Sequence, residues 1–475
     1  MRRTLASLAM VGTVALAGCS LDLVNPNNPT PGGALSNPRA ATSRMIVGVI
    51  ATYRDGEAVR IRALGSYGRE SYFMFITDGR FITGPYRDWK QNNSFEAGTQ
   101  WGRYGNYRNA YEALKIIEAT TSLTDAEKSG ARGVLKTFIA LDMLHNIEAR
   151  GAIGAVVDMS DDANEVFPVV SQDSVYSWVS AKLNEAATDL AAAGATFYFP
   201  MHSGFSTFGV AANTPAGFLQ FNRAIAARAL VQHGSLGCAT CYAAALTALT
   251  GTWITNLDGT AANRDMGVYS IYSTAAGDAL NTVSFTGTSD LFTHPLIDSI
   301  PGVSADDRFS RKTVAVTPRS EVGVTSGRRP NVYATNTSPI PMVRNEELIL
   351  LRAEAEWFTG ATAAATTDLA SVRTNSGSIN GHTSVVAFAA PTTADQFTTE
   401  LLLQRSLSLL EEGQRWVDYR RFGRLAQLET LPQDVTAGFT VATTSVLPSQ
   451  ECDARSRVGA AAPMSCPGGP AVPVP

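Results

Sequence analysis

Charged side chains are scarce in this chain of 475 residues. Only 17% of the residues are Asp, Glu, Lys or Arg, whereas an average soluble protein has about 25%. The 38 basic and 42 acidic residues leave a net charge of -4, so no long-range positive field attracts a polyanion. The composition therefore argues against nucleic-acid binding.

Recognisable catalytic motifs are also missing. The sequence contains no HExxH, G-x-S-x-G, Walker or G-x-G-x-x-G motif, each of which would place reactive groups in a known geometry. The acidic residues Asp158, Asp161 and Asp162 are sequence neighbours, whereas glycosidase carboxylates face each other across about 5 to 9.5 Å. We interpret this cluster as a solvated or cation-binding loop, and we expect no enzymatic activity, cofactor or metal. The histidines, which lack metal-ligand spacing, are His145, His202, His233, His294 and His382.

One long apolar run is present, and it lies at the N-terminus. Arg2 and Arg3 precede an uncharged, largely apolar segment that is shorter than the roughly 20 residues of a membrane span, which is typical of a signal peptide over residues 1–18. It ends in "LAGC", which resembles the lipobox of bacterial lipoproteins and implies lipidation of Cys19. By the same resemblance, Ser20 argues against retention at the inner membrane. The alternative is an ordinary signal peptide with an accidental cysteine.

Residues 19–35 are rich in Pro and Asn, which predicts a flexible tether between the lipid and the folded part. We expect a single α-rich domain over residues 36–475. It would contain an insert at about 250–340, where short β-favouring runs alternate with Thr, Ser and Gly, and a Pro-rich tail at about 459–475. Apolar residues at helical spacing predict helices at 36–54, 101–120, 130–148, 172–193, 215–233, 345–358 and about 394–424.

Cysteines are few. Besides Cys19 there are four, an even number in an exported chain, which favours two disulfides. Pairing Cys238 with Cys241 and Cys452 with Cys466 closes the smallest loops and is our choice among three connectivities. A four-cysteine zinc site is the alternative, because C-x-x-C is a common zinc half-site.

Two C-terminal segments carry the most specific signal. "PIPMVRNEELILLRAEAEWFTG" and "LLLQRSLSLLEEGQRWVDYRRFG" closely resemble the two signature segments of the SusD/RagB family. Gln404, Ser408 and Gln414 depart from the pattern, which puts individual salt bridges in doubt. The positions that match it are Pro339, Pro341, Arg344, Glu347, Arg352, Ala353, Glu354, Ala355, Glu412, Gly413, Arg415, Trp416, Asp418, Arg421 and Gly423.

This resemblance implies a fold, a location and a role. The fold would be mainly α, with tetratricopeptide-like helix pairs, a loop-rich insert and a few short strands. The protein would be a surface-exposed outer-membrane lipoprotein that binds an oligosaccharide or peptide nutrient. Its partner would be a SusC-like TonB-dependent transporter, and it would not be an enzyme.

The charges of the signature segments predict a structural ion-pair network. On a helix, residues three apart can touch, so we expect contacts of Glu412 with Arg415, of Asp418 with Arg415 and Arg421, and of Arg344 with Glu347. The run Leu348–Leu351 is apolar on all sides and indicates burial, where an uncompensated charge costs about 3 to 5 kcal/mol. We therefore interpret the charges as structural rather than catalytic. The expected network comprises Arg344, Glu347, Arg352, Glu354, Glu412, Arg415, Asp418 and Arg421.

A ligand-binding protein of this kind needs exposed aromatic rings. The segment 77–98 has Tyr86 and Trp89 beside Arg87 and Asp88, and we predict a ligand platform there because polar neighbours are costly to bury. A second candidate is segment 196–208, through Tyr198 and Phe199. The alternative for each ring is packing in the core.

Two other functional classes stay open. A surface glycoside hydrolase would also be an exported, helix-containing lipoprotein, and it would release reducing ends from a polysaccharide. A structural scaffold lipoprotein would bind a partner protein but no small ligand.

We expect intact-mass measurement on native membranes to show a mature chain that begins at lipidated Cys19, because signal peptide and lipobox occur in the required order. A soluble mature protein with an unmodified thiol would contradict this prediction.

Overall fold

The computed structural model describes residues 37–90, 98–162, 164–384, 388–428 and 430–474. The expected signal peptide, Cys19 and the whole tether fall outside these residues. Within them the fold is mainly helical, and the strands form three two-stranded sheets. No helix of this part of the chain is both long and apolar enough to cross a membrane.

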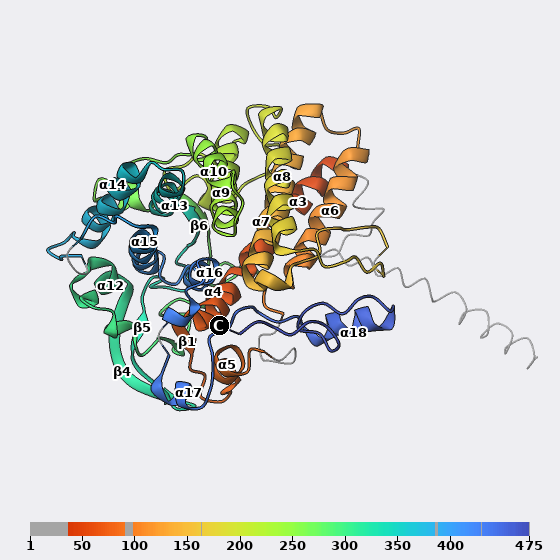
Figure 1. Ribbon diagram of the computed structural model, residues 1–475. Coiled ribbons are helices and arrows are strands. Elements are labelled where there is room, and N and C mark those ends of the chain that lie inside the picture. The colour runs from red at the N-terminus through yellow and green to blue at the C-terminus, as the bar shows by residue number, and fades with distance from the viewer. Residues whose placement is uncertain (1–36, 91–97, 163, 385–387, 429, 475) are drawn as a thin grey trace, which may run out of the picture.

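The first half is a row of helices in which neighbours along the chain pack side by side (Figure 1). This confirms the predicted helices to within a few residues. The row consists of α3 (Pro38–Asp55), α6 (Arg103–Ala119), α7 (Asp125–Arg150), α8 (Gln172–Ala191), α9 (Pro215–Ser235) and α10 (Cys241–Thr250).

Helix α7 begins five residues before the predicted range because a capping box starts it. The Thr124 hydroxyl accepts the Glu127 backbone N–H at 3.3 Å, and the Glu127 carboxylate accepts the Thr124 N–H at 2.9 Å. Such reciprocal bonds satisfy two otherwise unpaired amides of the first turn. The first turn of α7 is polar and so adds nothing to the apolar pattern. The prediction from that pattern therefore placed the start of the helix too late.

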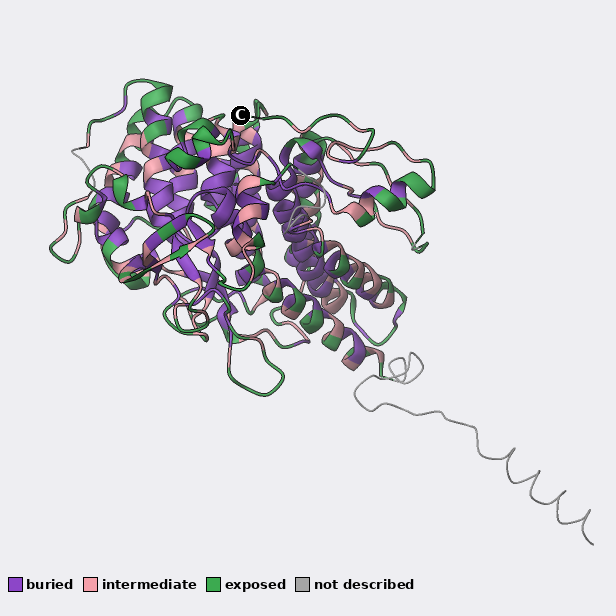
Figure 2. Ribbon diagram, turned by 90° about the horizontal axis from the view of Figure 1, so that it is seen from below, coloured by how far each residue is buried: buried purple, intermediate pink, exposed green. Residues whose placement is uncertain are grey.

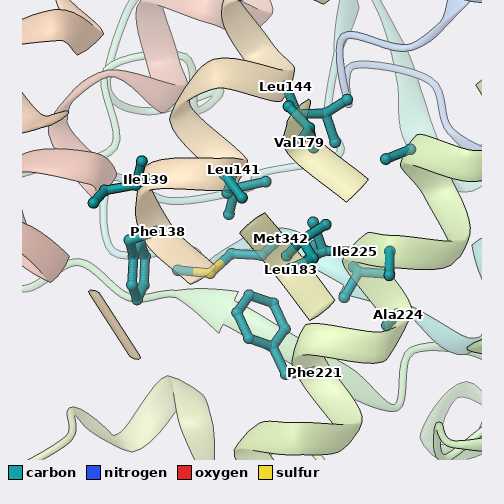
Figure 3. Close-up of a cluster of buried hydrophobic side chains, with 14 of the residues drawn as sticks. Phe138, Ile139, Leu141, Leu144, Val179, Leu183, Phe221, Ala224, Ile225 and Met342 are labelled. Carbon is teal, nitrogen blue, oxygen red and sulfur yellow. The ribbon is translucent and has the colours of Figure 1, made fainter. Parts of the chain in front are cut away.

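The principal core lies between α7, α8 and α9 (Figure 3). Phe138 of α7, Leu183 of α8 and Phe221 of α9 meet there with Met342 of a later strand. Helices α7 and α8 approach so closely that a Cβ on Gly133 would lie 2.5 Å from the Leu190 Cγ. Figure 2 shows the buried faces of these helices turned inward and the exposed residues gathered on the periphery.

The second half supplies another helical group and most of the strands. Its helices are α13 (Asn345–Phe358), α14 (Thr362–Val372), α15 (Ala394–Ser408) and α16 (Arg415–Arg421). The predicted helix at 394–424 is wrong in its middle: the chain turns between α15 and α16, where Glu411 and Gly413 have φ of 60° and 71°.

Short antiparallel strands account for the predicted insert. The three pairs are β1 (Ser71–Phe73) with β3 (Leu291–Thr293), β2 (Gly267–Ser270) with β6 (Ile340–Arg344), and β4 (Thr313–Glu321) with β5 (Val324–Pro330). The remaining short elements are α4 (Glu57–Tyr67), α5 (Arg80–Ile82), α11 (Ala261–Arg264), α12 (Asp307–Lys312), α17 (Pro432–Thr436), α18 (Ser449–Arg457), and the single turns Thr83–Arg87, Gly151–Ile153, Ser203–Phe205, Ile297–Ser299, Val303–Ala305, Arg373–Gly377 and Leu425–Gln427.

Buried ion pairs join the two signature segments, as expected. Arg421 binds the Glu354 carboxylate, with Nη2 at 2.6 Å from Oε2, and contacts Asp418 at 3.0 Å. Arg344 binds Glu412 at 2.8 Å and Glu346 at 2.5 Å. All of these side chains are buried, so the charges compensate one another inside the protein.

Several individual pairings differ from the helical spacing. The predicted Arg344 to Glu347 contact is wrong because Arg344 is the last residue of β6, ahead of the helix, and Glu347 binds Arg228 at 2.6 Å. Glu412 precedes α16, so the expected spacing from Arg415 does not apply. Arg415 donates to the carbonyl oxygens of Gly68 and Arg69 at 3.2 and 2.8 Å. Arg352 binds Asp368 at 2.7 Å.

Both predicted disulfides are confirmed. Cys238 is bonded to Cys241 and Cys452 to Cys466, with Cα atoms 5.5 and 5.4 Å apart. The four-cysteine zinc site is wrong, because the two pairs lie at different places in the fold, one beside α10 and the other beside α18 (Figure 1).

Two buried acids, Glu70 and Glu411, lie side by side beneath this network. The Glu411 backbone N–H donates to the Glu70 carboxylate at 3.3 Å. Burial, and next the negative charge of Glu411, raise the pKa of Glu70 to about 8. Burial also raises the pKa of Glu411 to about 7, although Ser71 and Lys312 favour its charged form. The fold therefore favours the protonated form of this pair.

We expect the contribution of the Glu70–Glu411 pair to the free energy of unfolding to fall as pH rises from about 5 to 8. The unfolded chain releases these protons near the ordinary carboxyl pKa, whereas the folded protein holds them to higher pH, so the stabilisation present at low pH is lost on raising it. The slope is up to about 1.4 kcal/mol per pH unit for each proton involved. Urea denaturation at several pH values measures it.

Glu70→Gln should shift the measured slope of stability against pH in the positive direction relative to the parent, because an amide keeps the shape of the protonated carboxyl without titrating. An exposed acid changed in the same way, Glu118→Gln, should leave the slope as it is. Equal slopes in the two variants would show that the buried pair is not the cause.

Candidate functional site

An open pocket of about 450 Å³ lies where α3 and α4 meet the start of α6. Its volume lies within the range typical of small-molecule sites. The residues that line it come from these three helices, the segment before α6, and α7: Thr52, Gly56, Val59, Arg62, Gly98, Thr99, Gln100, Gly102, Arg103, Asn106 and Asp142.

The floor of the pocket is polar and tightly connected. Asp142 of α7 accepts hydrogen bonds from Arg103 at 2.8 Å and from the Asn106 amide at 2.7 Å. Arg103 also binds Glu57. The Asn106 Oδ1 atom is buried, and within the described chain no donor reaches it. A buried acceptor of this kind is costly to leave unsatisfied, so a donor from a bound ligand would be favoured.

Charge on the floor is fixed by these contacts. Burial raises the pKa of Asp142 to about 6, although Arg103 and Asn106 both favour its ionised form. Burial would raise the pKa of Glu57 too, but the nearby positive charges, Arg60 first, outweigh it and lower the pKa to about 2. The floor thus offers a rigid set of hydrogen-bonding groups.

Three phenylalanine rings lie next to the pocket. They belong to Phe73 in β1, to Phe75 in the segment that follows β1, and to Phe81 in α5. Their ring centroids lie 4.8 to 6.0 Å apart. The Arg62 guanidinium lies over Phe73 at 5.3 Å and over Phe81 at 5.0 Å, which is the geometry of a cation–π interaction. Because Arg62 also lines the pocket, the rings and the pocket form one continuous feature, which we call the Arg62 site.

The Arg62 site includes unusually exposed apolar side chains. Phe75 is 36% exposed, Ile76 is 66% exposed, and Val59 at the pocket wall is 41% exposed. Contiguous exposed apolar surface next to polar groups marks interaction sites.

The predicted platform at Tyr86 and Trp89 is wrong. Both rings are fully buried. Trp89 packs with Leu64 and Trp416, and its indole N–H donates to the Thr440 carbonyl oxygen at 2.9 Å. Tyr86 packs against Tyr72, with ring centroids 5.0 Å apart.

The physical argument behind that prediction failed because the charges beside the rings are compensated. Arg87 is only 12% exposed and pairs with the buried Asp434 at 2.9 Å, while Asp88 is exposed to water. The rings can therefore be buried at little cost, since each neighbouring charge is either paired or solvated. Residues 91–97 of the predicted segment lie outside the part of the chain that the structure describes.

The second candidate, segment 196–208, also belongs to the core. Phe199 is buried and stacks on Phe197 at 4.8 Å. Tyr198 is half-buried, and its hydroxyl donates to Thr42 at 3.0 Å. Neither ring lines the Arg62 site.

The acidic cluster behaves as a solvated loop. Asp161 is exposed and binds Lys115 at 2.6 Å, and Asp162 accepts the Asn164 N–H at 2.8 Å.

The prediction missed the rings of the Arg62 site because Phe73 and Phe75 lie before the predicted segment 77–98, and Phe81 lies near its start. In "SYFMFITDGRF", residues 71–81, phenylalanines alternate with buried Tyr72 and Met74. Alternation of this kind indicates a strand with one exposed face, and that signal would have pointed to Phe73 and Phe75.

Comparison with known families gives one match. Residues 311–452 match the SusD family, and this range contains both signature segments. Comparison with curated protein sequences gives no match.

Solved structures share the fold of almost the whole chain. A SusD superfamily protein from Bacteroides vulgatus is 17% identical, with 91% of this chain and 99% of that chain covered and a TM-score of 0.63. NanU from B. fragilis is 15% identical, with 89% and 95% covered and a TM-score of 0.60. A laminarin-binding SusD-like protein is 14% identical, with 86% and 97% covered and a TM-score of 0.61. The similarity confirms the predicted helical fold.

We expect Trp89→Ala to lower the free energy of unfolding by about 3 to 5 kcal/mol, because it empties a closed core position. Urea denaturation measures the loss. Phe75→Ala, which truncates an exposed ring, should cost far less and serves as the control. A Trp89→Ala variant as stable as the parent would show that the indole is not packed as described.

Proposed function

The chain belongs to the SusD/RagB family, and from that membership we propose that it is an outer-membrane lipoprotein that binds a nutrient at the cell surface. In this proposal Cys19 carries the lipid, and residues 19–35 connect it to the folded part. A SusC-like TonB-dependent transporter is the partner that receives the nutrient. The protein binds and transfers its ligand without chemical conversion.

The observation that carries the proposal is the Arg62 site. The exposed ring of Phe75 and the half-buried ring of Phe81 provide flat apolar faces, and the adjoining pocket supplies an unsatisfied acceptor at Asn106. Ligands with alternating apolar faces and hydrogen-bonding groups match such a surface. Oligosaccharides and peptides both have this character.

The ligand is an oligosaccharide or a peptide. One protein of the same fold is a laminarin-binding SusD-like protein, which supports a glycan as the first class to test. The rings here are phenylalanines rather than tryptophans, and Val59 and Ile76 add apolar surface. That composition keeps apolar peptides as the second class.

The signature charges support the non-enzymatic part of the proposal. Arg344 is buried and paired with Glu412, and Arg421 is buried and paired with Glu354. Side chains held in this way stabilise the fold and cannot reach a substrate. A glycoside hydrolase and a pure scaffold are the alternatives.

We expect Phe75→Ala and Phe81→Ala each to weaken ligand binding about tenfold, which corresponds to about 1.4 kcal/mol. Isothermal titration calorimetry against laminarin oligosaccharides and against a set of apolar peptides identifies the ligand class and then measures the loss. Phe358→Ala truncates a ring that is similarly exposed but lies at the end of α13, and it should not change the affinity.

Equal weakening by Phe358→Ala, or no weakening by either of the other two variants, would move the binding surface away from the Arg62 site. Reducing ends released during incubation with the polysaccharide would favour a hydrolase. Binding of a transporter without any glycan or peptide ligand would favour a scaffold.

A further inference from the structure

A compact group of metal-ligating atoms lies at the C-terminal end of α9, remote in sequence from the lining of the Arg62 site. The ligand atoms of His233, Cys238 and Cys241 all lie within 4.8 Å of one another. His233 and Cys241 are buried and Cys238 is partly exposed, so the group is preorganised but open to solvent on one side. The two sulfurs are bonded to each other.

The distances fit a tetrahedral site. Zn–S bonds of about 2.3 Å and Zn–N bonds of about 2.1 Å at a tetrahedral angle place sulfur and nitrogen about 3.6 Å apart. The His233 Nδ1 atom lies 3.5 Å from the Cys241 Sγ. The same geometry places two sulfurs about 3.8 Å apart, so they need only separate once their bond is broken.

Neighbouring groups favour metal binding by the histidine. The other ring nitrogen, Nε2, lies 2.7 Å from the Asp173 carboxylate, to which it donates when it carries the proton. That arrangement leaves Nδ1 with its lone pair toward the sulfurs, and carboxylate partners of this kind orient metal-binding histidines. The ring is also held by stacking on Tyr176 at 5.5 Å.

The electrostatics agree. The group sits at the C-terminal end of a 21-residue helix, where the unpaired carbonyl groups give a partial negative charge that attracts cations.

We propose that the Cys238–Cys241 disulfide is a redox-gated metal site, which binds Zn²⁺ or a similar thiophilic divalent cation when it is reduced. The ligands are the two sulfurs and His233 Nδ1, and water completes the tetrahedron. Three protein ligands with one open position differ from a closed structural zinc site.

The redox step requires a dithiol or a phosphine as reductant. A dithiol gives two electrons and two protons to the Cys238–Cys241 bond and is itself oxidised to a disulfide, which leaves two cysteine thiols. The divalent cation then displaces both thiol protons, so each cation bound releases two protons to solvent. In the reverse step the disulfide form of the dithiol takes two electrons from the two cysteine sulfurs, together with two protons from solvent, which restores the Cys238–Cys241 bond and releases the cation.

Cobalt(II) is the probe for this site, because its visible and near-ultraviolet bands report tetrahedral geometry and sulfur ligation. The protein is reduced anaerobically with a water-soluble phosphine, freed of it by gel filtration and titrated with Co²⁺. We expect one Co²⁺ per chain with sulfur-to-cobalt charge-transfer bands, and no such bands from the oxidised protein. Zn²⁺ should displace the cobalt and abolish the bands.

Variants separate the ligands. Cys238→Ser with Cys241→Ser should abolish the bands while keeping Cys452 and Cys466, which controls for binding at the second cysteine pair. Asp173→Asn keeps all three ligands, and its side chain is 79% exposed, so folding is preserved. It should weaken Co²⁺ binding about tenfold or more. His233→Gln should weaken binding at least as much.

Unchanged bands in the double serine variant, a stoichiometric signal from the oxidised protein, or no signal from reduced protein that keeps its circular dichroism would each overturn the proposal. Full affinity in both the Asp173→Asn and His233→Gln variants would do the same.

Discussion

The compensation of buried charge is the constraint on which the rest of this structure depends. Arg421 at the end of α16 binds Glu354 of α13, while Arg344 at the end of β6 binds Glu412 in the turn before α16. Both arginines are buried, and a buried charge without a partner would destabilise the folded protein by about 3 to 5 kcal/mol. The strand, the two helices and the turn must therefore assemble in one relative position. Exchange of any partner for an apolar residue would strand a charge in the interior, so these pairs specify the arrangement of the C-terminal half.

The sequence predicted features whose cause is local or highly specific. Helices with a regular apolar stripe were located to within a few residues, and both disulfides were paired correctly because they close short loops. The burial of the signature charges and the contact of Asp418 with Arg421 were also predicted, but the partners in other segments were not. Helical spacing suggested contacts within one segment, whereas Glu347 binds Arg228, more than a hundred residues earlier. A pairing between distant segments leaves no periodic trace, so only the fold reveals it.

The prediction of the ligand platform was limited in the same way, because the burial of each ring also depends on distant segments. Composition correctly indicated that the region around residue 80 contains aromatic rings, but it could not decide which rings face solvent. Trp89 is buried because Trp416 packs with it and the Thr440 carbonyl oxygen accepts its indole N–H, whereas Phe75 is exposed although it stands between Met74 and Ile76 in an apolar run. Burial at these positions is set by what packs on them from the far end of the chain. An exposed apolar ring such as Phe75 is a liability for aggregation, and exposed apolar patches in stable proteins therefore commonly mark interaction sites.

The contact between α4 and α16 has a consequence for how this protein is made. Residues 57–67 find their packing partner in residues 415–421, and a Cβ on Gly68 would lie 3.0 Å from the Trp416 backbone nitrogen. Because the ribosome delivers the chain from its N-terminus, α4 emerges long before α16 does. The part of its buried face that packs on α16 is then open to solvent until nearly nine tenths of the polypeptide has emerged. Such long-range closure slows folding and leaves apolar surface open to aggregation, so truncation near the C-terminus would damage the packing of the beginning of the chain as well as that of its end.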